Sequence, residues 1–295
     1  MVTALAADLI ESSAAAEAAR LPLSTRFELG DELTPLQRAF LDKNGFCIFG
    51  GVAKPEELDA IYSEVCAIQE RWLSERRKKV YGIPLFAGKD PEGRPFIQRF
   101  AFTSNYSEHI RAFVTDERFE PVRRLIGADA RVGHEEKDGV VFNRNLNVKG
   151  SAYPRLGWHT DGLRSLFYGR LPGPMLNVGL HFDRIKKEQG GLRLIPGSHK
   201  QGFWDMALGK PYFVHHKPDP WELAIETEPG DLTIHDGRLW HRVEKNPITG
   251  WASLRRTMYV PYICDDYSPK TEDSPTPIYH HLGRGLRWIK KNAPL

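Results

Sequence analysis

The stretch 157-GWHTDG-162 places a histidine and an aspartate two residues apart, directly before a glycine. The residues around it predict a strand that ends in a turn. In a strand, residues i and i+2 point to the same side of the sheet. His159 and Asp161 can therefore present an imidazole and a carboxylate side by side. The pair is either the polar end of a strand that faces water, or half of a metal site with a ligand elsewhere.

A third ligand is available in 229-PGDLTIHDGRLWHRV-243, which contains His235 and His241. His235 precedes the Asp-Gly of a predicted turn, and His241 follows that turn at the expected start of the next strand. Two histidines and one carboxylate, with open coordination positions, are typical of non-haem Fe(II) sites that react with oxygen. On spacing alone the pattern is unspecific, so a purely structural origin of these residues stays an alternative.

The sequence around these two stretches, from about residue 131 onward, predicts a β-rich core. Short apolar and β-branched runs alternate with Pro-Gly and Asp-Gly turns. The run 176-LNVGLHF-182 alternates strictly, as expected of a strand with one face in the core. One face carries Leu176, Val178, Leu180 and Phe182, and the other carries Asn177, Gly179 and His181.

The N-terminal third predicts mainly helices. In 34-TPLQRAFLDKNG-45, Thr34 is a candidate N-cap, Gln37 occupies the capping-box position, and Gly45 ends the helix. Apolar residues at spacings of three and four predict a long amphipathic helix over 55–76.

A further helical region is expected over 108–126, and 46-FCIF-49 reads as a short strand. We expect a flexible or helical tail at 1–30, followed by a single domain over 31–295. The helices of this domain should pack on one sheet of the β core.

Composition excludes several classes of function. The chain has 295 residues, 41% of them hydrophobic, and a net charge of +3, which gives no reason to expect a nucleic-acid or membrane partner. Three cysteines without paired spacing fit a reducing compartment. The first 20 residues carry acidic side chains and no uninterrupted apolar run, so no signal peptide is expected. We therefore expect a cytoplasmic location.

Four motifs occur in an order that resembles the phytanoyl-CoA dioxygenase-like family of Fe(II)- and 2-oxoglutarate-dependent oxygenases. They are 157-GWHTDG-162, 190-GGLRLIPGSHKQG-202, 229-PGDLTIHDGRLWH-241 and 254-LRRTMYVPY-262. The segment 34–58 also resembles the family's opening helix and strand, so the resemblance covers about residues 34 to 265. The Pro-Gly-Ser-His turn followed by Pro-Gly-Asp and a distal histidine is its most specific part.

The resemblance implies a mainly β fold with flanking helices. Its core would be a double-stranded β-helix, a jelly roll of the cupin type, that encloses a site between two sheets. His159, Asp161 and His241 match the family's iron ligands, and His241 matches better than His235 because it follows the Leu-Trp turn. Implied cofactors are Fe(II), 2-oxoglutarate as co-substrate, and O2.

The implied activity is that of a dioxygenase that hydroxylates or otherwise oxidises an unactivated C–H bond, with release of succinate and CO2. An aspartate at position 161 favours hydroxylation or a related oxidation, because halogenating relatives carry a small residue there.

The far carboxylate of 2-oxoglutarate needs a cation, and the planar guanidinium of arginine pairs with a carboxylate through two parallel hydrogen bonds. The family carries this arginine on the strand after the distal histidine, where this chain has Arg255 and Arg256 on opposite faces. Alignment of the following residues favours Arg255, with Thr257 and Tyr259 on its face. An apparent insertion at 248–253 keeps Arg256 as the second choice.

Residues beside the motif strands are candidates for contact with a substrate. We expect a small molecule or natural product, because the family acts on diverse compounds and nothing in the sequence selects among them. The sequence does not indicate an oligomeric state. The candidates are Trp158, Asn145, Asn147, Phe167 and Tyr168.

Three other functions are alternatives to this one. A cupin-like metal-dependent hydrolase or isomerase would bind zinc or manganese with the three ligands, but would have no use for a carboxylate-binding arginine. A non-catalytic ligand-binding β-barrel would have no reason to keep all three ligands. An oxygenase that acts on proteins would need an open groove.

Overall fold

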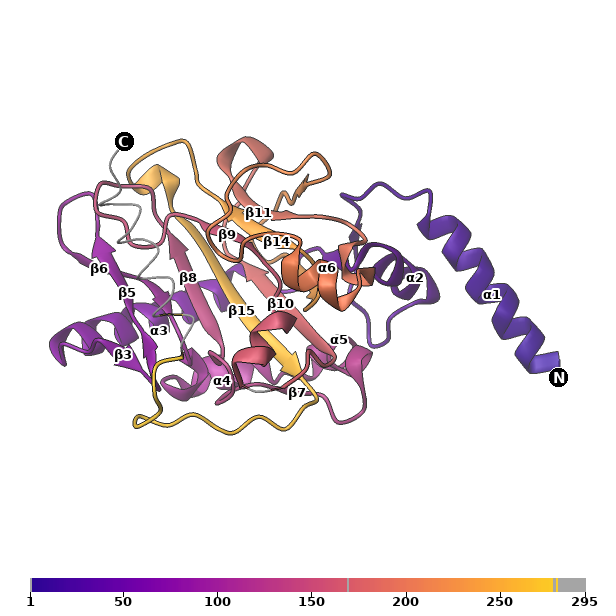
Figure 1. Cartoon of the computed structure of the whole chain (residues 1–295), viewed down its shortest axis with the longest axis horizontal. Coiled ribbons are helices and arrows are strands. Elements are labelled where there is room, and N and C mark those ends of the chain that lie inside the picture. The colour runs from indigo at the N-terminus through magenta and orange to yellow at the C-terminus, as the bar shows by residue number, and fades with distance from the viewer. Residues whose placement is uncertain (1, 169, 278–279, 281–295) are drawn as a thin grey trace.

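Two opposed β-sheets hold the centre of the chain in the computed structural model, which describes residues 2–168, 170–277 and 280 (Figure 1). The nine-stranded major sheet follows the order β1-β2-β13-β10-β15-β8-β6-β5, with β7 paired to β15. Its strands are β1 (Arg26–Phe27), β2 (Phe46–Phe49), β5 (Phe86–Lys89), β6 (Pro95–Phe100), β7 (Arg131–Val132), β8 (Val141–Asn145), β10 (Met175–His181), β13 (Leu232–Asp236) and β15 (Arg255–Ile263).

The four-stranded minor sheet has the order β12-β11-β14-β9. It is built from β9 (Leu156–His159), β11 (Gly191–Leu194), β12 (Leu223–Ala224) and β14 (His241–Glu244), and a separate two-stranded sheet joins β3 (Lys79–Val80) to β4 (Ile83–Pro84). Two facing sheets with helices on one of them agree with the predicted jelly-roll fold class.

The helices of the described residues lie mostly in the first half of the chain, before β7, and one follows β11. They are α1 (Val2–Ala18), α2 (Pro35–Asn44), α3 (Pro55–Ser74), α4 (Glu108–Val114), α5 (Glu120–Arg123) and α6 (Phe203–Leu208). Short 3-10 turns lie at Thr103–Asn105, Glu117–Phe119, Arg124–Ile126, Gly162–Tyr168, Lys187–Gln189, Ser198–Lys200 and Trp251–Ser253. None of the helices in these described ranges is long and apolar enough to cross a membrane.

The N-terminal segment forms α1, which lies beside α2 and projects beyond the sheets (Figure 1). Ala14 and Ala18 are its buried residues among those whose burial is described. The division into a tail at 1–30 and one domain over 31–295 stays a prediction, because residues 281–295 lie outside the described part.

The caps predicted for α2 are present. The Thr34 hydroxyl accepts a hydrogen bond from the Gln37 backbone N–H at 3.2 Å, and the Gln37 side chain accepts one from the Thr34 backbone N–H at 2.8 Å. Gly45 ends the helix with φ of 78°, a left-handed conformation that glycine adopts without a Cβ clash. The sequence therefore fixes both ends of this helix locally.

The main hydrophobic core lies between α3 and the major sheet. The apolar stripe of α3 is buried in one cluster with the even-numbered residues of β10 and β15, including Val178 and Val260. Ring pairs join the layers, with Tyr62 stacked on Phe142 at 6.0 Å between centroids. The odd-numbered residues of β10 and β15 consequently face the minor sheet.

The sheet begins earlier in the chain than the sequence pattern suggested. Strands β5 and β6 extend the major sheet beyond β8, so the predicted start near residue 131 was wrong for this edge. Four of the six residues of β6 are buried, because its two faces are both covered. A strand covered on both faces lacks the polar-apolar alternation that identified the later strands.

Trp72 tests the core between α3 and the sheet. It is 0% exposed and packs against Phe100 with 5.6 Å between ring centroids. Trp72→Ala should lower the free energy of unfolding by about 3–5 kcal/mol, because the removed indole leaves a cavity. The control Trp221→Ala, at a residue 80% exposed, should change it by less than about 0.5 kcal/mol. Urea denaturation measures both, and equal losses would contradict this packing.

Candidate metal centre

His159, Asp161 and His241 meet at one end of the minor sheet. His159 is the last residue of β9 and His241 is the first residue of β14. The two strands are antiparallel, and their register places His159 directly opposite His241. Cross-strand partners on one face lie close together, and the two imidazole centroids are 4.1 Å apart. Asp161 follows in the turn that leaves β9, so three candidate ligands converge from β9, its exit turn and β14.

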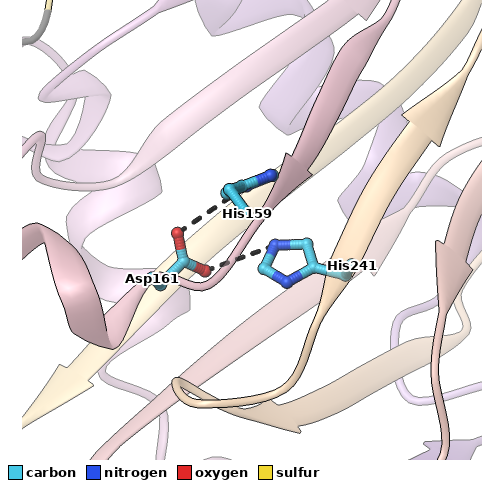
Figure 2. Close-up of side chains that lie close together, drawn as sticks. All are labelled: His159, Asp161 and His241. Carbon is cyan, nitrogen blue, oxygen red and sulfur yellow. Dashed lines mark ion pairs between the residues drawn. The ribbon is translucent and has the colours of Figure 1, made fainter. Parts of the chain in front are cut away.

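The donor atoms of these three residues form a compact group (Figure 2). Each residue offers one ligand atom, and the three atoms lie within 4.8 Å of one another. His241 Nε2 is 3.5 Å from Asp161 Oδ2, and His159 Nε2 is 4.0 Å from Asp161 Oδ1. All three side chains are buried.

Hydrogen bonds around the group orient the donor atoms. His159 Nδ1 lies 2.8 Å from the Gly157 carbonyl, and His241 Nδ1 lies 3.0 Å from the Leu239 carbonyl. A carbonyl only accepts, so each Nδ1 carries the proton and each Nε2 keeps its lone pair. Asn177, on the inner face of β10, donates to Asp161 Oδ2 at 2.6 Å. Such outer contacts are characteristic of metal ligands.

The protonation states suit a cation. Burial lowers the pKa of both His159 and His241, so both rings are neutral at neutral pH. Burial alone would raise the pKa of Asp161, but the imidazoles around it and the guanidinium of Arg164, whose Nη1 lies 3.7 Å from Asp161 Oδ1, hold this pKa well below its usual value. Two neutral imidazoles and one ionised carboxylate are the forms in which these groups bind a metal.

His235 lies beside the group without completing it. It is buried on β13, with Nε2 3.7 Å from Asp161 Oδ2 and its ring centroid 4.5 Å from that of His241. Neither ring nitrogen of His235 has a hydrogen-bond partner in the described ranges. The three-residue group that converges contains His241, the histidine that the motif resemblance favoured.

The two adjacent arginines of β15 point to opposite sides of the major sheet. Arg256 faces α3, where it pairs with Asp183 at 2.6 Å and lies over the Tyr62 ring. Arg255 faces the inside and is 4% exposed. Its Nη1 donates to the Gln189 carbonyl at 3.2 Å, its Nε has no hydrogen-bond partner, and no carboxylate of the described residues pairs with it. Burial lowers the pKa of Arg255 to about 10, which still leaves it charged at neutral pH.

A cavity of about 410 Å³ surrounds the inner end of β15. Arg255, Thr257 and Tyr259 line one wall from the same face of the strand. An unpaired buried guanidinium is costly unless an anion joins it. The other residues that line this cavity are Asn143, Asn145, His181, Ile185, Gly191, Leu192, Ile225, Thr227 and Val243.

A second cavity, of about 640 Å³, opens onto the three candidate ligands. Its remaining wall comes from β6, β8, β9, β10, β14 and β15, the segment 137–139, Tyr153 and Arg164. Apart from Tyr259, which belongs to the fourth motif, sequence reasoning did not predict these residues as part of the site, because they lie far apart in the chain. The polar ones are Arg99, Lys137, Asp138, Asn143, Tyr153, Arg164, Asn177 and Tyr259.

The sequence-predicted substrate residues are distributed unevenly. Asn145 lines the smaller cavity and donates to the Tyr153 carbonyl at 3.0 Å. Asn147 lines neither of these two cavities. Its side-chain amide instead donates hydrogen bonds to the carbonyls of Asn246 and Ile248 in the 246–253 loop. Trp158 alternates with His159 along β9, so its ring lies on the far face, between Lys210 and Arg242. The side chains of Phe167 and Tyr168 lie outside the described part.

Comparison with known proteins shows which family this chain belongs to. The profile described as phytanoyl-CoA dioxygenase matches residues 41–247, which is well over half of the chain. The chain belongs to the phytanoyl-CoA dioxygenase family. The family predicted from the four motifs is thereby confirmed, and the protein is an iron- and 2-oxoglutarate-dependent dioxygenase. The hydrolase and non-catalytic alternatives find no support.

Individual relatives agree with this family. The chain is 25% identical over 247 residues to a probable alpha-ketoglutarate-dependent hypophosphite dioxygenase of Stutzerimonas stutzeri, covering 79% of each chain. Among solved structures, HygX of Streptomyces hygroscopicus, with nickel and 2-oxoglutarate bound, has a TM-score of 0.57 and 19% identity, covering 81% of this chain and 89% of that one. The carbocyclase SnoK from nogalamycin biosynthesis has a TM-score of 0.58 and 19% identity, covering 88% and 93%. These two structures share the fold.

Buried histidines in the cavity walls make stability depend on pH. Burial lowers the pKa of His181 to about 3, whereas an unfolded histidine titrates near 6.5. Below pH 6.5 the unfolded chain therefore takes up a proton that the folded chain does not, and stability falls as pH falls. The loss per histidine is at most about 1.4 kcal/mol per pH unit.

We expect the free energy of unfolding of the metal-free protein to decrease between pH 7 and pH 5, as measured by urea denaturation. His181→Asn should reduce the slope of the free energy of unfolding against pH by up to about 1.4 kcal/mol per pH unit, the contribution of one proton. Identical slopes for the variant and the parent would show that His181 is protonated in the folded protein.

Proposed function

We propose that His159, Asp161 and His241 hold Fe(II), that Arg255 binds the far carboxylate of 2-oxoglutarate, and that the enzyme hydroxylates a C–H bond of a small molecule. The observation that carries this proposal is the convergence of two imidazole Nε2 atoms and one carboxylate with a buried arginine, without an ion-pair partner among the described residues, inside the same pair of sheets. Succinate and CO2 would be the co-products.

The donor set supports iron as the metal. Two neutral imidazoles and one carboxylate on one side of an ion leave its other positions open, which is the arrangement of non-haem Fe(II) oxygenases. The second-nitrogen hydrogen bonds of His159 and His241 and the amide of Asn177 hold the three donors in place before any ion arrives. Pre-oriented ligands of this kind strengthen metal binding.

The arrangement of β15 supports Arg255 as the co-substrate residue. A dicarboxylate needs the metal at one end and a cation at the other, and Arg255 supplies a charge that no carboxylate of the described residues neutralises. Thr257 shares its face and can donate a hydroxyl proton to the same carboxylate. Arg256 is already paired with Asp183 and points away from the cavity.

Bound iron would supply the chemistry that breaks an unactivated C–H bond, with O2 as the oxidant and 2-oxoglutarate as the reductant that leaves as succinate and CO2. The residues of this chain bind and orient the reactants. Asp161 would offer its carboxylate to the metal, which supports hydroxylation over halide transfer. The larger cavity holds the substrate beside His159 and His241 and limits its contact with water.

Arg255 and Arg256 give a matched pair for testing the co-substrate site. Arg255→Ala should weaken 2-oxoglutarate binding at least about tenfold, because charge-assisted hydrogen bonds contribute about 1.5–3 kcal/mol. Arg256→Ala should leave it within twofold. Anaerobic titration with Fe(II) and 2-oxoglutarate, followed by the visible charge-transfer absorption of the chelate, measures both. Equal weakening in the two variants would remove Arg255 from this role.

Asp161 tests the metal site. Asp161→Ala should lose stoichiometric Fe(II) binding and substrate hydroxylation, because two imidazoles alone bind Fe(II) weakly. Asp205→Ala, at an exposed residue of α6, should keep both. Metal content after dialysis and succinate release provide the readouts. Full retention of both properties in Asp161→Ala would end its assignment as a ligand.

A further inference from the structure

We propose that the substrate is a small anion, with a carboxylate or phosphoryl-type group held by Lys137 and Arg99 in the cavity of about 640 Å³ beside the three candidate metal ligands. This inference rests on the proposed function, because it names the substrate class of the same site. Both cations line this cavity from outside the metal ligands.

Lys137 carries a buried ammonium group that no carboxylate of the described residues pairs with. The residue is 4% exposed, and its Nζ lies 3.0 Å from Met175 Sδ and 5.0 Å from the centroid of the Tyr267 ring. No carboxylate of the described residues lies within 4.0 Å of Nζ. A buried ammonium without a counter-ion is costly, so such a group is typical of a binding site for an anion.

The backbone of Lys137 gives a second sign of function. Its φ is 56°, in the left-handed region that residues with a Cβ rarely adopt. Strain of this kind persists where the surroundings impose it and concentrates at binding sites. Burial lowers the pKa of Lys137 to about 8, so the ammonium form still predominates at pH 7. The chain thus keeps a positive charge at this point although both the burial of the ammonium group and the left-handed backbone are unfavourable.

Arg99 offers a second donor in the wall of the same cavity. Its Nη2 pairs with Asp138 at 2.6 Å, while its buried Nη1 has no hydrogen-bond partner among the described residues. Asp138 also pairs with Arg164 at 2.5 Å, so one carboxylate serves two guanidinium groups. The lining therefore holds three cationic side chains against Asp138 and the metal ligand Asp161. A bound Fe(II) would add two further positive charges.

The anionic group of the substrate and the far carboxylate of 2-oxoglutarate would lie in different cavities. Arg255 lines the smaller cavity, where the co-substrate carboxylate is proposed to bind, and neither Lys137 nor Arg99 lines it. The larger cavity contains Lys137, Arg99 and the candidate ligands but not Arg255. An anionic group of the substrate held by Lys137 would thus orient the rest of the molecule within the cavity onto which the metal ligands open.

Binding of simple anions to the protein loaded with Fe(II) and saturating 2-oxoglutarate tests this inference. The probes are butyrate against butyramide, and methylphosphonate against its neutral dimethyl ester, titrated anaerobically by calorimetry and by the charge-transfer absorption. At least one anion should bind at least tenfold more tightly than its neutral partner. The two pairs distinguish a carboxylate from a phosphoryl group.

The variants are Lys137→Met, Arg99→Gln and, as the control, Lys79→Met, which removes one exposed lysine from β3. Lys137→Met and Arg99→Gln should each weaken anion binding at least tenfold while 2-oxoglutarate binding stays within twofold, and Lys79→Met should change neither. If Lys137→Met fails to fold, Arg99→Gln decides.

Three results would overturn the inference. They are equal binding of anions and neutral partners, displacement of 2-oxoglutarate by the anions, and weaker 2-oxoglutarate binding in Lys137→Met. The last would move Lys137 to the co-substrate site. Absence of the charge-transfer absorption in the parent protein would instead overturn the proposed function itself, so the two failures are distinguishable.

Discussion

The pairing of β9 with β14 is the constraint on which the rest of the site depends. Their register sets His159 opposite His241, and a slip of one residue in either strand would turn the imidazole of that strand to the far face of the minor sheet. Backbone carbonyls of Gly157 and Leu239 then fix each ring through Nδ1. Sheet hydrogen bonding, rather than the metal, therefore arranges the donor atoms, and burial keeps the rings neutral.

The major sheet supplies the second half of the arrangement by strict alternation. Its helix-facing residues form the hydrophobic core with α3. This packing holds the inward-facing residues of the same strands in position, among them Asn177, Arg255 and Tyr259. The stability of this core offsets the unfavourable free energy of burying the Arg255 guanidinium. Stability and chemistry thus occupy opposite faces of the same strands, which lets the site keep polar and charged groups without weakening the packing.

Much of this arrangement could be predicted from sequence, and the exceptions have physical causes. The caps of α2 depend on neighbours within a few residues, and the alternation of 176–182 is visible in the chain itself. The ligand group needed the motif resemblance, because Asp161 and His241 are 80 residues apart. Lys137 and Arg99 match no motif, since only the folded sheets bring them to one cavity. Trp158 could have been excluded, because the alternation that points His159 inward points its neighbour outward.

The wall between the two cavities has a consequence for how this fold diversifies. Asn143, Val243 and Tyr259 border both spaces, while Arg255 borders one and Lys137 the other. Residues that choose the substrate can therefore be exchanged without disturbing those proposed to bind iron and 2-oxoglutarate. Evolution can keep the candidate metal ligands and Arg255 constant and vary the other residues that line the larger cavity, which fits a shared architecture at 19% identity to the carbocyclase. The substrate can then change through side chains that bind neither iron nor 2-oxoglutarate.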